Sequence, residues 1–345
     1  MMDKFFCADA SKCAQEDIIG TASNYQAYVL IECCVPWEYE AFNSQQIPQN
    51  LKDLVEEVEH SKQNIRFLLI NNDRTKCANQ RKVLIYENKH QELFGGYEKH
   101  EFNVDSIDQV AEIVKSYLAG EVPDYENENE SSRDILVCTH GSHDMCCARY
   151  GNPFYAEAVA LVSELELNDV RVWKSSHFGG HRMAPTAIDL TDGRYYGNLD
   201  RNSFQSILTR TGDIECLNQV YRGSGILPSP IQVFERELIV LYGWDWFNYK
   251  IASNFLDSET RNDAFFAEIT FEKADGTYTY RADLVKDETK TVRLKGSCGA
   301  QKESEFVKYS VENFHFYSKK EELMFVGYPL DHSAVETATT QTKSA

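Results

Sequence analysis

Short apolar runs of strand length alternate with segments of helical period along the first two thirds of the chain, and this alternation limits the fold more than any other feature. Tyr28–Glu32, Ile65–Ile70 and Val83–Tyr86 are rich in β-branched residues and have the length of strands. Leu51–His60 and Ser106–Gly120 carry apolar residues at helical spacing, and the second ends in glycine. The order β-α-β-β-α predicts an α/β fold.

The same order returns after Glu121–Ser132, an acidic stretch with a proline that we interpret as a linker. The second set of predicted elements comprises strands at Ile135–Val137, Val170–Trp173, Ala187–Leu190 and Arg194–Tyr196, and helices at Asn152–Leu165 and Ser203–Arg210. The two sets are offset by roughly 105 residues, which indicates a diverged duplication. A small mixed sheet flanked by helices is typical of a thioredoxin-like fold, so we expect two thioredoxin-like halves.

The last third of the chain has a different pattern. Ile231–Ile251 predicts an amphipathic helix, and Ala267–Leu284 predicts a hairpin that turns at Asp275-Gly276. The runs TVRLKG and EFVKYSVENFHFY predict further strands. The predicted organisation is an N-terminal degenerate thioredoxin-like domain (1–125), a thioredoxin-like ferredoxin domain (126–215), a C-terminal helical and β module (216–330) and a disordered tail (331–345).

The composition excludes some functions. A formal net charge of −19 argues against a nucleic-acid partner, because phosphate contacts need lysine and arginine. No stretch approaches the roughly 20 apolar residues of a membrane span, and the first residues lack a secretory signal. We therefore expect a cytoplasmic protein whose ten cysteines are thiols or metal ligands rather than disulfides. The chain has no C-x-x-C pair, which disfavours dithiol exchange.

Two segments carry residues suited to metal chemistry, Cys138–Tyr155 and Trp173–Leu190. Each leaves the end of a predicted strand, so in a parallel arrangement both loops lie at the same edge of the sheet. Within the second segment His177 and His181 enclose Phe-Gly-Gly. Two consecutive glycines cost about 1 kcal/mol each inside a helix, so we predict a loop. A Gly-Gly turn also lets the backbone approach a ligand closely.

These segments read CTHGSHDMCCARYG and SSHFGGHRMAPT, and with GTASNYQAYVLIECCVPWEYEAF (Gly20–Phe42) they resemble the sucrase/ferredoxin-like family. The resemblance extends from about residue 7 to about residue 225. The members of this family include thioredoxin-like ferredoxin domains. The resemblance implies a [2Fe–2S] cluster held by a Cys-x8-Cys pair and a His-x-Gly-Gly-His pair, with backbone contacts from the glycines. In this chain those residues are Cys138, Cys147, His177, His181, Gly179 and Gly180. No pair of carboxylates typical of a glycosidase supports the "sucrase" part of the family's name.

Such a ligand set implies one-electron chemistry. Two thiolates neutralise the two positive charges of an oxidised cluster, so adding an electron is easier than with four thiolates. Imidazole ligands carry an ionisable N–H, so electron uptake should be coupled to proton uptake at His177 or His181. We therefore expect an electron carrier rather than an enzyme with its own substrate. Its partner would be a redox protein, for example a reductase, that docks through a basic patch.

Several assignments stay open. The family spacing favours Cys147 over Cys146, which would then be a buried structural thiol. His140 and His143 could hydrogen-bond near the cluster or only fill the loop. Arg182 could assist docking, stabilise the reduced charge or be an ordinary surface residue. By the resemblance, Pro185 occupies the place where thioredoxin-like folds often have a cis proline.

The remaining cysteines receive no ligand role. Cys33 and Cys34 follow the strand equivalent to the one before Cys138, but the first half has no His-x3-His and offers only Cys77 beside them. We interpret that half as having lost its cluster. The cysteines left without any assignment are Cys7, Cys13, Cys216 and Cys298.

Two other functions fit the same residues. Two cysteines and two histidines also form a structural zinc site, although the Cys-x8-Cys spacing is long for a zinc finger. Alternatively, the duplicated fold could be an interaction module without metal, which would tolerate loss of His177 and His181.

Overall fold

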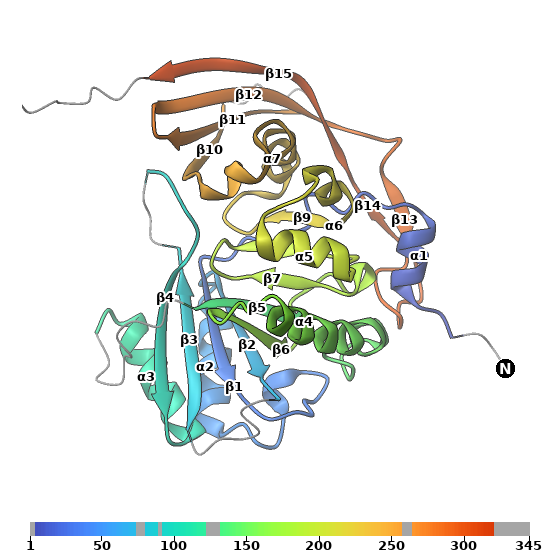
Figure 1. The fold of residues 1–345 in the computed structure, drawn as a ribbon. Helices are drawn as coiled ribbons and strands as arrows, with labels where there is room; N and C mark the ends of the chain where they lie inside the picture. Colours follow the sequence, from blue (N-terminus) through green and yellow to red (C-terminus); the bar gives the residue numbers. More distant parts are fainter. Residues whose placement is uncertain (1–3, 74–79, 89–91, 122–131, 257–263, 321–345) are drawn as a thin grey trace, which may run out of the picture.

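One arrangement of strands and helices occurs twice in the molecule (Figure 1). The computed structural model describes residues 4–73, 80–88, 92–121, 132–256 and 264–320. In the first half the strand order is β4-β3-β1-β2, with β1 and β2 parallel and the other pairs antiparallel. In the second half the order β8-β7-β5-β6 repeats these relations, with β5 and β6 as the parallel pair. The predicted α/β class with two thioredoxin-like halves is confirmed.

The elements of the two halves have the following bounds. The strands are β1 (Ala27–Glu32), β2 (Ile65–Asn71), β3 (Arg81–Glu87), β4 (Glu98–Val104), β5 (Arg133–Cys138), β6 (Val170–Ser175), β7 (Ala187–Asp189), β8 (Arg194–Tyr196) and β9 (Tyr221–Ser224). The helices are α1 (Cys7–Cys13), α2 (Gln49–His60), α3 (Val110–Leu118), α4 (Asn152–Glu164), α5 (Arg201–Thr209), α6 (Leu217–Val220) and α7 (Ser229–Tyr242).

The two halves share one sheet because β2 and β6 pair antiparallel at their C-terminal ends. The register joins Ile70 to Ser175 and Asn71 to Lys174. Across the described residues this produces a nine-stranded sheet, in which β9 extends the edge beyond β8. Since the overlap is confined to the last residues of both strands, the loops that leave the sheet there from the two halves meet each other.

The predicted helices form where the apolar spacing placed them. On α2 the buried residues are Leu51, Leu54, Val55 and Val58, the positions of the predicted helical face. A short turn capped by Ser106 and Gln109 precedes α3, and Gly120 follows the helix at a φ of +80°. The predicted order of the first half lacked β4, because Glu98–Val104 is mostly polar. Antiparallel pairing with β3 forms this edge strand and buries Phe102 and Val104.

The C-terminal part covers one side of the second half. The predicted hairpin is present as β11 (Ala264–Lys273) and β12 (Gly276–Lys286). Together with β10 (Ile251–Phe255) and β15 (Tyr309–Lys320) it forms a four-stranded sheet that arches over α7 (Figure 1). A smaller hairpin, β13 (Val292–Leu294) and β14 (Ser304–Phe306), lies beside α1.

The proposed domain boundaries stay a prediction, although β9 shows that the large sheet continues past residue 216. Residues 122–131 of the predicted linker and the predicted tail 331–345 lie outside the described residues. None of the helices in the described ranges combines the length and hydropathy needed to cross a bilayer.

Candidate metal centre

The parallel strands β5 and β6 bring the two predicted ligand loops to one edge of the sheet. Cys138 is the last residue of β5 and pairs with Ser175, the last residue of β6. Cys147 begins a π-helical turn, Cys147–Gly151, that leads into α4. A Cβ atom on Gly151 would lie 2.0 Å from the carbonyl oxygen of Cys138, so only glycine allows this turn to pack against the end of β5.

The histidine loop runs back along the first half. The Ser176 N–H donates to the Leu69 carbonyl of β2 at 2.8 Å, and His177 follows. Gly179 and Gly180 have φ angles of +95° and +85°, so the predicted loop is present and no helix spans the two histidines. His181 then starts a short 3-10 turn, and the Ala184–Pro185 peptide bond is cis, as the resemblance implied.

The structure brings three of the four predicted ligands into direct proximity. The Sγ atoms of Cys138 and Cys147 each lie 3.7 Å from the Nδ1 atom of His177. Both cysteines are 1% exposed. The ring of His181 lies 4.9 Å from that of His177, centroid to centroid. A second donor group is formed by the nitrogens of His143, His177 and His181, so His177 belongs to both groups.

Metal binding requires deprotonated ligands, and the surroundings favour that form at Cys138, His177 and His181 but not at Cys147. A hydrogen bond from Cys147, assisted by the backbone N–H groups of His140 and Phe178, holds the pKa of Cys138 below its usual range although burial acts to raise it. The same pairing, together with burial, raises the pKa of Cys147. Burial lowers the pKa of His177 to about 2 and also lowers that of His181. Both imidazoles are therefore neutral at physiological pH and carry a free lone pair.

His140 orients the loop instead of offering a free nitrogen. Its Nδ1 accepts the N–H of His177 at 3.1 Å, and its Nε2 lies 2.7 Å from the Glu38 carbonyl oxygen. A carbonyl only accepts, so these partners assign the proton to Nε2. His143 lies between two rings, with centroids 4.1 Å from His177 and 4.8 Å from Tyr39. The sequence alone left both roles open.

Arg222 is a charged neighbour that the sequence analysis missed. It is 2% exposed and donates to the Thr21 carbonyl at 2.7 Å and the Gly179 carbonyl at 3.3 Å. Burial lowers the pKa of Arg222 to about 10, so the guanidinium stays charged at neutral pH close to the Cys138 sulfur. A Cβ on Gly180 would lie 2.5 Å from this guanidinium. Arg222 lies in β9, far from both motifs, so no local pattern pointed to it.

Arg182 is not an ordinary surface residue and is not free for docking. Its Nη2 lies 2.8 Å from a carboxylate oxygen of Glu16, and its guanidinium lies 3.7 Å from the ring centroid of Phe306. The arginine therefore ties the histidine loop to the N-terminal segment and to β14.

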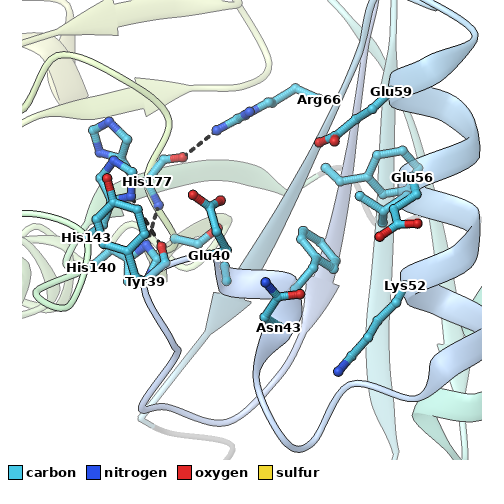
Figure 2. A pocket seen from close by; sticks show the side chains of 15 residues that line it. Tyr39, Glu40, Asn43, Lys52, Glu56, Glu59, Arg66, His140, His143 and His177 are labelled. Atoms are coloured by element: carbon cyan, nitrogen blue, oxygen red, sulfur yellow. Dashed lines mark hydrogen bonds between the residues drawn. The ribbon is translucent and has the colours of Figure 1, made fainter.

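A pocket of about 240 Å³ opens beside the histidines (Figure 2). One wall contains His140, His143 and His177, and the other comes from α2, β2 and the loop after β1. Arg66 on β2 donates to the His177 carbonyl oxygen at 2.7 Å. Three acidic residues also line the pocket, namely Glu40, Glu56 and Glu59. The sequence patterns did not predict this pocket.

The structure corrects two expectations about the other cysteines. Cys7 and Cys298, which received no ligand role, lie with Cys146 and Asp144 in a separate group of metal-type donors. Cys34 is disulfide-bonded, contrary to the expectation that the cysteines are thiols or ligands. Cys33 is buried in the core of the first half, where burial raises its pKa to about 11. Cys77 lies outside the described residues.

The remaining two cysteines belong to none of the donor groups found among the described residues. Cys13 is exposed at the end of α1, and Cys216 is partly buried.

Comparison with known proteins yields one family. The sucrase/ferredoxin-like family model matches residues 18–223, which include both ligand loops and more than half of the chain. No curated protein and no solved structure matches the chain.

Proposed function

Because this chain belongs to the sucrase/ferredoxin-like family, we propose that it binds a [2Fe–2S] cluster and transfers single electrons. The observation that carries the proposal is the convergence of Cys138, Cys147 and His177 at the buried edge of the sheet, with His181 beside them. Two thiolates and two imidazoles are a donor set known for such clusters. When bound, the cluster would accept and release one electron.

The residues around the donors support this chemistry. The Cys147 side chain and the N–H groups of His140 and Phe178 donate to the Cys138 sulfur and favour its thiolate form. Within the histidine loop the donating amide is that of Phe178, whereas Gly179 and Gly180 supply the turn and the space for Arg222. The buried positive charge of Arg222 would offset the negative charge added on reduction.

The histidines can link electron transfer to a proton. A coordinating imidazole uses one ring nitrogen and holds an exchangeable proton on the other. His177 lines the pocket, which gives its loop access to solvent. We therefore propose that electron uptake is accompanied by proton uptake on His177 or His181.

The pocket is also our proposed docking face for a redox partner. Glu40, Glu56 and Glu59 outnumber Lys52 and Arg66 in its lining, and the whole chain carries a net charge of −19. A partner with a basic patch would be attracted to this face and would approach the histidine side of the centre.

A single zinc ion is the second candidate occupant, because one observation favours it. Zinc ligands at about 2.3 Å for sulfur and about 2.0 Å for nitrogen, arranged as a tetrahedron, lie about 3.5 Å apart. The two Sγ–Nδ1 distances of 3.7 Å are close to that separation. A two-iron cluster would require the histidine loop to stand farther from the thiols.

Metal and sulfide analysis of anaerobically purified protein separates the two occupants. The proposed function predicts a red-brown protein with iron and acid-labile sulfide in equal amounts and an EPR signal after reduction. A colourless protein without iron or sulfide would contradict it. If zinc were then lost on replacing His177 and His181, the second candidate would be correct.

A further inference from the structure

Three thiols and one carboxylate from distant segments of the chain converge in a second donor group. Cys7 comes from α1, Asp144 and Cys146 from the loop after β5, and Cys298 from the loop between β13 and β14. The four donor atoms all lie within 4.8 Å of one another. Cys7 and Cys146 are buried, and Cys298 is partly buried.

The spacing of the sulfurs is that of ligands to one ion. The Cys146 Sγ lies 3.5 Å from that of Cys7 and 3.3 Å from that of Cys298, and the third pair is 3.7 Å apart. Sulfurs bound to zinc at about 2.3 Å with tetrahedral angles lie about 3.8 Å apart. A disulfide, by contrast, joins sulfurs at about 2.05 Å and could use only two of the three.

Asp144 completes the set as an oxygen donor. Its Oδ1 lies 3.1 Å from the Cys298 Sγ and 3.9 Å from the Cys7 Sγ. The carboxylate is fixed by the N–H of Cys146 at 2.8 Å and the N–H of Cys298 at 2.9 Å. The N–H of Ala8 donates to the Cys146 sulfur at 3.4 Å. These donors hold the ligand atoms in place before any ion binds.

We propose that Cys7, Asp144, Cys146 and Cys298 bind a structural Zn²⁺ ion. Thiolates and a carboxylate close together in a buried site repel one another, and a divalent cation removes that cost. Three sulfurs and one oxygen at tetrahedral separations suit zinc, and the absence of an open coordination position indicates a structural role. The ion would join α1, the ligand loop and the C-terminal module.

This site is separate from the centre at His177 and does not depend on the proposed electron transfer. The vicinal cysteines divide between the two, with Cys147 facing His177 and Cys146 facing Cys7. Asp144 lies between them, since its Oδ2 is 3.4 Å from the Nδ1 of His181.

The test is the zinc content of the full chain and of single variants. We expect one equivalent of zinc that survives dialysis, and its loss in Cys7→Ser and in Cys298→Ser, with iron and sulfide unchanged. Cys13→Ser is the matched control, because Cys13 lies on the same helix but is exposed and should leave zinc unchanged. Zinc should also survive His177→Ala, which removes a ligand of the other centre.

A second readout keeps the test valid if a variant folds poorly. Replacing zinc with Co²⁺ in the native chain should produce thiolate-to-cobalt charge-transfer bands that Cys298→Ser lacks. Three outcomes would overturn the proposal: native protein without zinc, zinc retained in both Cys7→Ser and Cys298→Ser, or a disulfide among these three cysteines in protein purified without oxidant. Zinc lost only with His177→Ala would instead assign the ion to the other centre.

Discussion

The side chains of two adjacent residues, Cys146 and Cys147, lie in different donor groups. They lie at the start of a helical turn, where successive side chains diverge by about 100°. Cys147 therefore reaches His177 while Cys146 reaches Cys7 and Cys298. The family spacing favours Cys147 over Cys146 as a ligand, but nothing in the local sequence showed what Cys146 contacts.

We predict that Cys147→Ser loses the cluster, whereas Cys146→Ser keeps it and loses zinc. Serine supplies neither the soft donor nor the charge of a thiolate at neutral pH. Absorption spectra together with iron, sulfide and zinc contents of both variants check this. If visible absorption survived in Cys147→Ser and vanished in Cys146→Ser, the ligand assignment would be wrong by one residue.

The reduction potential should depend on pH if His177 and His181 are ligands. Reduction adds negative charge, so the reduced protein binds the imidazole proton more tightly. Below the pKa of the oxidised state both forms are protonated and the potential is constant. Above it, and below the pKa of the reduced state, the potential should fall by about 59 mV per pH unit for one proton and one electron.

Redox titration over a range of pH measures this slope. The double variant with cysteine at 177 and 181, where it assembles a cluster, serves as the comparison and should show a lower potential and a flat profile. A constant potential in the native protein, across the range where the histidines titrate, would show that they do not bind the cluster or never lose a proton.

A buried group of three charged side chains connects the N-terminal segment to the histidine loop and to the C-terminal module. Glu16 lies 2.8 Å from Arg182 in the histidine loop and 2.9 Å from Lys308 next to β15. Burial acts to raise the pKa of Glu16, but the hydrogen bonds and charges of Arg182 and Lys308 lower it to about 2 from an ordinary value of 4.5. The carboxylate therefore stabilises the folded state above about pH 4.5, and this contribution is lost as the pH falls toward 2.

We predict that Glu16→Gln lowers the free energy of unfolding at pH 7 by about 3 kcal/mol, because about 1.4 kcal/mol corresponds to each pKa unit. The variant should also lose less stability than the native protein between pH 4.5 and pH 2. Urea unfolding at several pH values measures both effects. Glu57→Gln is the control, since the ion pair of Glu57 with Lys115 is exposed. Equal losses in the two variants would contradict the role of the buried group.

The sequence predicted the helices and strands that have a strong apolar period. It missed a strand that forms only through hydrogen bonds to a neighbouring strand. Alternating apolar runs identified β1, β2 and β3, and the spacing on α2 identified its buried face. β4 escaped because its residues are mostly polar, and its strand conformation comes from hydrogen bonds to β3. Local pattern contains no information about such partners.

In the candidate site, too, residues within the two motifs could be predicted, whereas residues that reach the site from distant segments could not. The family resemblance implied Cys138, Cys147, His177 and His181 as ligands, and the parallel strands explain why the two loops meet. Arg222 could not be predicted in this way. Neither could Cys7 or Cys298, since each reaches Cys146 across 139 or more residues.

The first half covers the centre that the second half carries. Its loop after β1 accepts hydrogen bonds from His140 and Ser142 at the carbonyls of Glu38 and Trp37. Its helix α2 supplies the acidic wall of the pocket (Figure 2). The half without the His-x3-His motif thus lines the pocket that leads to His177.

We predict that reversing the charge of this wall slows electron exchange with a basic partner. The double variant Glu56→Lys, Glu59→Lys should reduce the rate with a basic cytochrome several-fold at low salt, with a smaller effect at high salt, because exposed charges are screened. Stopped-flow absorption measures the rate. The double variant Asp53→Lys, Glu57→Lys is the matched control, because it changes the charge of the same helix by the same amount at exposed residues outside the pocket lining. Equal slowing by the control would show that only net charge matters.

The contacts of the N-terminal segment with the C-terminal module also order events during synthesis. Glu16 and Lys308 are 292 residues apart, and Cys7 and Cys298 are 291 apart. At about 5–20 residues per second, a ribosome needs roughly 15–60 s to make the intervening chain. Both halves of the large sheet are complete within that interval. The N-terminal segment with α1 therefore forms its contacts to Cys298 and Lys308 only after the large sheet has been synthesised. A chain that ended before residue 298 would contain all strands of the large sheet but would lack these contacts.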